Sequence, residues 1–244
     1  EMSASLVGSE MCIRDSRNID LMSALPGQTI ESYEDTLSKV LALEPEHISA
    51  YSLILEEGTV FYDWYEKGKL DRGAWKLPSE EEEYAMGELT ILRLAEAGMH
   101  RYEISNYAKQ GKECRHNLGY WDRTEYLGIG AGSSSLIKGE RFDHIRDRKA
   151  YIEKIRNGES ILIDREILSV ESQMEEFMYL GLRKVEGVSR TDFQNYFGKN
   201  VDDVYGKVLD KLEEEKLLEY EDDRIRLTHR GMDVSNCVLA EFLF

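Results

Sequence analysis

The segment IDLMSALPGQT, residues 19–29, decides the fold of this chain. Its apolar start predicts a strand, and its proline–glycine pair predicts a turn. Thr29 can cap a helix that runs to about Leu43, and Pro45 ends that helix. The apolar residues 47–54 predict a second strand. Two strands joined by a helical crossover form a βαβ unit, which is normally parallel, so we predict an α/β fold.

The longest predicted helix follows, over residues 79–97. Ser79 and Glu82 fit a capping box at its start, and Gly98 fits the left-handed residue after its end. We also predict helices over residues 59–67 and 149–156 and a strand over residues 100–107. Residues 114–121 are expected in a loop, and residues 126–135 form a glycine-rich stretch.

The tail, residues 166–244, is predicted to be a small separate domain. Its pattern gives three helices, a β-hairpin and one closing helix over residues 230–239, which is a winged-helix-like α+β arrangement. The second helix is expected to point Phe193, Tyr196 and Phe197 inward. The helix that would enter a DNA groove, residues 201–216, carries six acidic side chains against three lysines, so we expect no nucleic-acid partner.

Composition bounds the class of protein. The 244 residues carry 31 basic and 48 acidic side chains, a formal net charge of −17, which argues against a general binder of anionic surfaces. No apolar run approaches the roughly 20 residues of a membrane span. Three scattered cysteines, Cys12, Cys114 and Cys237, give no disulfide framework or zinc pattern, so we expect a reducing cytoplasm.

Residues 1–16, EMSASLVGSEMCIRDS, do not fit the rest of the chain. They lack the basic start and the long apolar core of a signal peptide. We expect a non-native leader and exclude it from the fold; a disordered native tail is the alternative.

Three motifs together point to one family. Residues 20–29, DLMSALPGQT, resemble the "DLxxGLPGQT" segment of the oxygen-independent coproporphyrinogen III oxidase-like proteins, a branch of the radical-SAM superfamily. Residues 102–108 resemble their "YEISNYA" segment, and residues 116–121 match the "HNxxYW" signature of the heme-chaperone branch. The resemblance covers about residue 17 to the C-terminus.

The resemblance implies a fold and cofactors. Family members have a partial (β/α)6 barrel that holds a [4Fe–4S] cluster on a C-x-x-x-C-x-x-C loop, with S-adenosylmethionine on the open iron. Residues 17–165 would then be the C-terminal part of that barrel and residues 166–244 the family's C-terminal domain. The cluster cysteines have no counterpart here, so we expect a fragment without that loop and assign no metal ligand.

Asp20, Gly128 and Gly130 are the candidates for binding S-adenosylmethionine. A carboxylate near the carboxyl end of a parallel strand can accept two hydrogen bonds from a ribose diol, and the family's matching Asp does so. The alternative is that Asp20 caps a turn. The glycines allow close backbone approach, either to a neighbouring strand or to the adenosine end of the cofactor.

His116 is the candidate heme ligand. Imidazole ligates heme iron, and the nearby rings of Tyr120 and Trp121 could stack on a porphyrin. The resemblance adds Asn117 to this heme-binding set. By chemistry alone, a loop histidine beside a tryptophan is more often structural. Cys114 is a competing axial ligand, with an inert buried thiol as the plainer interpretation. The other histidines are expected to be structural: His47, His100, His144 and His229.

The resemblance therefore implies a heme-binding chaperone that hands heme to client proteins. The alternative is an oxygen-independent coproporphyrinogen III dehydrogenase, which decarboxylates its substrate oxidatively through a 5′-deoxyadenosyl radical. We expect the fragment itself to be inactive as an enzyme, because that radical needs the missing cluster. A stand-alone winged-helix module is disfavoured by its charge, and the oligomeric state is left open.

Overall fold

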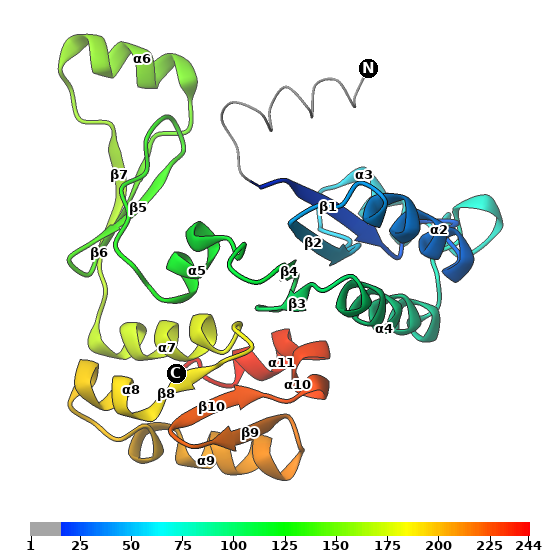
Figure 1. Ribbon diagram of the computed structural model, residues 1–244. Helices are drawn as coiled ribbons and strands as arrows, with labels where there is room; N and C mark the ends of the chain where they lie inside the picture. Colours follow the sequence, from blue (N-terminus) through cyan, green and yellow to red (C-terminus); the bar gives the residue numbers. More distant parts are fainter. Residues whose placement is uncertain (1–15) are drawn as a thin grey trace. The chain divides into compact units, whose positions relative to one another are not determined.

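The computed structural model describes residues 16–244 (Figure 1). The expectation of a non-native leader at residues 1–16 falls, apart from Ser16, outside the described residues. The described chain forms two compact units, which divide between Cys114 and Arg115.

The first unit is built on the predicted βαβ element. Strand β1 (Asn18–Ser23) pairs in parallel with β2 (His47–Ser52), and helix α2 (Ile30–Leu41) connects them. The Thr29 hydroxyl accepts a hydrogen bond from the Ser32 backbone, and the Ser32 side chain bonds back to Thr29, so a capping box begins the helix. The parallel pairing that residues 19–54 predict is confirmed.

The rest of this unit covers the sheet and extends it. Helix α4 (Glu80–Glu96) begins with the predicted Ser79–Glu82 capping box. Ahead of it lie α3 (Val60–Glu66) and the short 3₁₀ helix η1 (Gly73–Trp75). Eight buried side chains of the sheet, α2, α4 and the turn after α4 form the core: Leu21, Tyr33, Leu37, Ile48, Met86, Leu94, Met99 and Tyr107.

The strand expected at residues 100–107 is two short strands, β3 (His100–Arg101) and β4 (Asn106–Ala108). The buried Glu103 carboxylate accepts hydrogen bonds from the Ser105 backbone and the Asn106 side chain, which stabilises a turn between them. β4 therefore runs antiparallel to both β3 and β2, and the sheet order is β1-β2-β4-β3.

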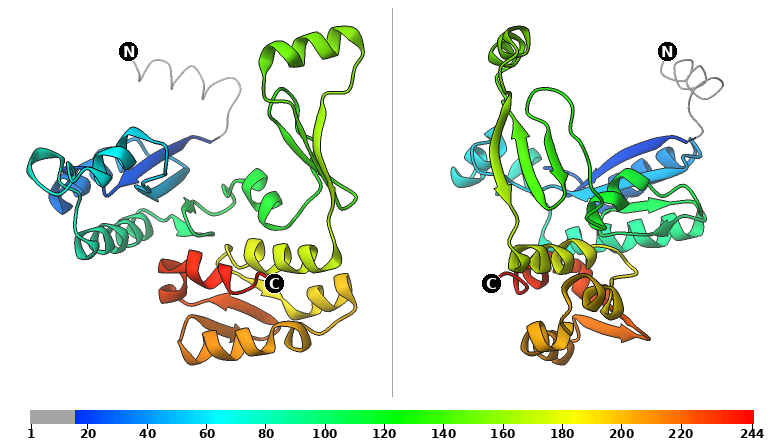
Figure 2. Two further views of the ribbon diagram at one scale, coloured as in Figure 1. Left: turned by 180° about the vertical axis from the view of Figure 1, so that it is seen from behind. Right: turned by 90° about the vertical axis from the view of Figure 1, so that its left-hand side faces the viewer.

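The second unit opens with a helix and an antiparallel sheet. Residues 114–121 were expected in a loop, but Arg115–Trp121 form helix α5. Strands β5 (Ser134–Ile137), β6 (Glu140–His144) and β7 (Leu162–Ile167) form an elongated sheet with α6 (Arg148–Asn157) at its far end (Figure 2). Lys138 and Gly139 both have positive φ, as a two-residue hairpin turn requires. That Lys-Gly signal was missed.

The tail has the predicted order of three helices and a hairpin (Figure 1). The strands β8 (Val188–Ser189), β10 (Arg224–Leu227) and β9 (Leu218–Glu221) pair antiparallel in that order. The helices are α7 (Val170–Gly181), α8 (Arg190–Phe197), α9 (Val201–Glu214), α10 (His229–Asp233) and α11 (Ser235–Ala240).

Two expectations for the tail are wrong. The closing helix is two short helices, because the chain leaves helical geometry at Val234. Phe193 is fully buried, but Tyr196 is 73% exposed, since the packed face of so short a helix holds few side chains. Within residues 16–244, no helix has the length and apolar character needed to cross a membrane.

Candidate functional site

Asp20 lies in the middle of β1, not at its carboxyl end. It is the third of six strand residues, is exposed, and pairs in register with Ser49. Its carboxylate accepts a hydrogen bond from the Asn18 amide at 2.8 Å, so it caps no turn through that contact. An exposed carboxylate fits a ribose diol chemically, and its role in cofactor binding stays a prediction.

His47, the first residue of β2, is buried and makes polar contacts through both ring nitrogens. Its Nδ1 lies 2.6 Å from the Asn18 Oδ1, and its Nε2 lies 2.8 Å from the Tyr102 hydroxyl. Burial lowers the pKa of His47, and the charges of Asp20 and Glu113 oppose that shift. The expectation of a structural role fits these contacts, because both ring nitrogens have protein partners.

Helix α5 brings the predicted His116 and Tyr120 together. The two residues are four positions apart, and their rings meet edge to face with centroids 4.8 Å apart. The Tyr126 ring also meets Tyr120 edge to face, with centroids 4.8 Å apart. A hollow of about 170 Å³ lies here, and its lining residues are Arg115, His116, Gly119, Tyr120, Thr124, Glu125 and Tyr126.

Trp121 points elsewhere. Consecutive residues of a helix are rotated by about 100°, so Tyr120 and Trp121 do not share a face. The Arg183 guanidinium lies 4.4 Å from the Trp121 ring centroid. Trp121 also lines a second cavity of about 530 Å³, together with Phe177 and Tyr196, and its buried Nε1 has no hydrogen-bond partner. Helix α5 therefore does not present the Tyr120 and Trp121 rings on one face, as the expected stacking on one porphyrin face requires. Asn117 is partly buried on the same helix.

Charged side chains directly after the motif form ion pairs with buried charged side chains. The sequence did not predict these pairs. Arg123 donates to the Glu176 carboxylate at 3.2 Å, and Arg141 lies 2.8 Å from the same carboxylate. Burial lowers the pKa of Arg141, but Glu176 raises it, and the net shift is upward. Charged residues far apart in the sequence give no local pattern, so only the fold reveals this cluster.

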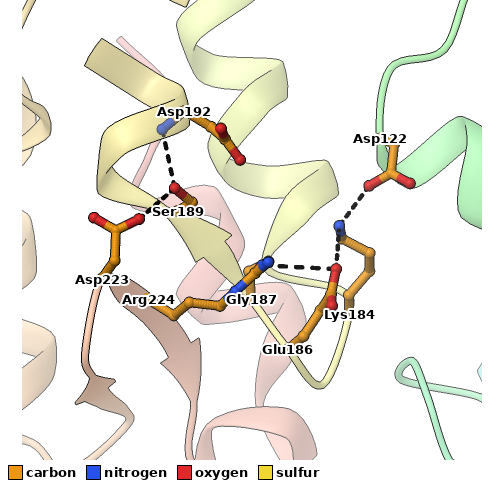
Figure 3. Close-up of polar contacts among 8 residues, drawn as sticks. All are labelled: Asp122, Lys184, Glu186, Gly187, Ser189, Asp192, Asp223 and Arg224. Atoms are coloured by element: carbon orange, nitrogen blue, oxygen red, sulfur yellow. Dashed lines mark hydrogen bonds and ion pairs between the residues drawn. The ribbon is translucent and has the colours of Figure 1, made fainter. Parts of the chain in front are cut away.

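Lys184 forms a second set of ion pairs near the end of the motif. Its ammonium pairs with the carboxylates of Asp122 and Glu186, as Figure 3 shows. Burial lowers the pKa of Lys184, but the two acidic partners raise it above its usual value. Figure 3 also shows Ser189 bonded to both Asp223 and the Asp192 backbone, which begins α8.

The two candidate glycines serve the hairpin region. A Cβ on Gly128 would lie 2.2 Å from the Ser134 carbonyl oxygen, so the backbone approaches β5 too closely for any side chain. The Gly130 carbonyl accepts hydrogen bonds from Ser133 Oγ at 2.8 Å and from His144 Nδ1 at 3.1 Å. Of the two alternatives for Gly128, the structure shows the approach to a neighbouring strand; contact with adenosine stays a prediction for both glycines.

The described residues do not fit an iron–sulfur cluster. Among residues 16–244, no group of three or more His, Cys, Asp and Glu side chains is arranged to hold a metal ion. Cys114 is partly buried and Cys237 is exposed, and they belong to different units. We assign no chemical step to a cluster in this chain.

Comparison with known proteins supports the sequence motifs. Residues 168–234 match the family described as the HemN C-terminal domain. The chain is 40% identical to the heme chaperone HemW of Bacillus subtilis over 226 residues, which cover 93% of this chain and 58% of that protein. The heme chaperone HemW of Lactococcus lactis is also 40% identical, over 92% of this chain and 58% of that protein. The chain thus spans less than two thirds of these relatives.

A solved structure shows the same fold. The coproporphyrinogen III oxidase HemN of Escherichia coli, described as a radical SAM enzyme, superposes with a TM-score of 0.79 at 19% identity. The match covers 99% of this chain and 58% of that one. The predicted α/β fold with a small C-terminal domain is confirmed, as is the predicted family resemblance.

Proposed function

We propose, from its similarity to the HemW heme chaperones and from the HemN C-terminal domain match, that this chain binds heme on helix α5 for delivery to client proteins. We propose that heme binding and delivery take place in the cytoplasm, where cysteines stay reduced. S-adenosylmethionine, with Asp20, Gly128 and Gly130 as its candidate contacts, and a [4Fe–4S] cluster belong to the same proposal for the complete family protein.

One observation carries the proposal: the exposed His116 imidazole stands edge to face with Tyr120 at the rim of a hollow. Imidazole nitrogen is a common axial ligand of heme iron, and aromatic rings contact the flat porphyrin favourably. When bound, the heme iron supplies the coordination position that His116 would fill. Tyr120 and Tyr126 would contact the macrocycle, with Asn117 on the same helix.

The hollow beside His116 is too small to enclose a porphyrin. At about 170 Å³ it is smaller than the roughly 300–1,000 Å³ of pockets that enclose small molecules. It would therefore take one edge of a porphyrin and leave the rest accessible to a receiving protein. A radical enzyme must instead exclude water from its intermediates. The shared fold with HemN shows the architecture only, so coproporphyrinogen oxidation remains the alternative that product analysis would detect.

Heme titration tests this proposal. We expect a Soret band to appear when heme is added to the wild-type chain, and His116→Ala to remove or strongly shift it. His100→Ala is the control, because His100 is a half-exposed histidine of the other unit and pairs with Glu113. No Soret band with the wild type would contradict heme binding, whereas an unchanged band in His116→Ala would contradict the ligand assignment.

A further inference from the structure

Three contacts join the chain at the end of the 116–121 motif to residues 168–234, the part that matches the HemN C-terminal domain. Trp121 lies under the Arg183 guanidinium, Asp122 pairs with Lys184, and Arg123 donates to Glu176. These three motif-side residues are consecutive in the sequence. Their three partners all fall within residues 168–234, the part that matches the HemN C-terminal domain.

Helix α5 needs such contacts to keep its position. It has only seven residues, whereas isolated helices shorter than about 12–15 residues are marginal in water. Two of the partners are well shielded: the side chain of Lys184 is 10% exposed and that of Glu176 is 5% exposed. Ion pairs in such surroundings are screened less by solvent than pairs at the surface.

From these contacts we propose that Lys184, Glu176 and Arg183 are positioning residues that hold the motif helix and so fix the orientation of His116. This gives the C-terminal domain a role in heme binding, although none of its three residues lines the hollow beside His116. The inference rests on the proposed function, because it concerns the same heme site. The three side chains act through α5 rather than as heme ligands.

The substitution Lys184→Met tests whether these contacts hold α5 in place. It keeps the length of the buried stem and removes the charge, and Asp122 and Glu186 are half exposed, so water can solvate them. We expect faster amide hydrogen exchange in residues 115–123 and heme affinity lower by about 10- to 100-fold, as for other residues that orient an iron or zinc ligand. Lys184→Arg should restore both.

Lys207→Met is the matched control, because Lys207 is an exposed lysine of α9 in the same domain. We expect neither readout to change in it. Asp122→Asn removes the same ion pair from the other side and serves if Lys184→Met does not fold. The proposal is overturned if exchange in residues 115–123 stays at the wild-type rate, or if exchange rises while heme affinity is unchanged. If the wild type binds no heme, the proposed function fails. Hydrogen exchange then still decides whether the positioning residues hold α5.

Discussion

At the scale of single residues, the candidate site depends on where each side chain of helix α5 points. His116 and Tyr120 are four residues apart and meet at one hollow, whereas Trp121 turns toward α7 and the Arg183 guanidinium. The six-residue motif therefore places His116 and Tyr120 at the hollow and Trp121 against Arg183. Arg115, directly before the motif, lines the same hollow.

We expect Arg115 to interact with a heme propionate. An exposed ion pair of this kind contributes about 0.2–1 kcal/mol, so Arg115→Ala should weaken heme binding by about 1.4- to fivefold. Heme dimethyl ester has no propionate charge, and its affinity should be the same for both proteins. Arg156→Ala, an exposed arginine of α6, is the control. An equal loss of affinity for both porphyrins in Arg115→Ala would contradict a charge contact.

At the scale of elements, backbone geometry decided what the hydrophobic pattern did not show. The alternation in residues 100–107 is that of a strand, but the buried Glu103 carboxylate stabilises a turn, so two strands form. The β5–β6 hairpin turns at Lys138 and Gly139, where both residues have positive φ. Beside it, Gly128 lies against the backbone of β5.

Gly128→Ala should destabilise the second unit. The new Cβ would meet the Ser134 carbonyl oxygen at 2.2 Å, and forced overpacking of this kind costs about 1–3 kcal/mol. Denaturant unfolding measures the change. Gly206→Ala is a useful contrast, because Gly206 is inside α9 with nothing within 4 Å of a Cβ, and alanine there should stabilise by up to about 1 kcal/mol. A neutral Gly128→Ala would show that this loop shifts freely.

At the scale of the whole molecule, stability depends on how many protons the folded and unfolded chains bind. The net charge of −17 is spread over both units, and the expectation of no nucleic-acid partner stays a prediction. His47 is a histidine whose pKa shift has a clear direction: burial lowers its pKa below 6.5 in the folded state. The unfolded chain then binds more protons than the folded chain over the pH range just below 6.5.

We therefore expect the first unit to lose stability as pH falls from about 7.5 to 5.5. The contribution of neutral His47 is complete above the unfolded pKa and is lost as pH falls from that value toward the lower folded pKa. Amide exchange of the buried Leu21 and Ile48 across this range measures the effect. The same measurement on His47→Gln should give a flatter profile; an equally steep one would assign the pH dependence to another group.

The sequence by itself determined the parallel βαβ unit, the capped helices α2 and α4 and the helix–hairpin order of the tail. Each of these follows from a local pattern: apolar periodicity, a capping hydroxyl or a turn residue. It also determined the family resemblance, since residues 20–29, 102–108 and 116–121 are contiguous motifs. Only the tertiary structure decided that Asp20 lies in the middle of its strand and that Trp121 is separated from Tyr120. It alone also revealed that Lys184 pairs with Asp122 and Glu176 with Arg123, because ion pairs between residues 53 or more positions apart leave no local signal.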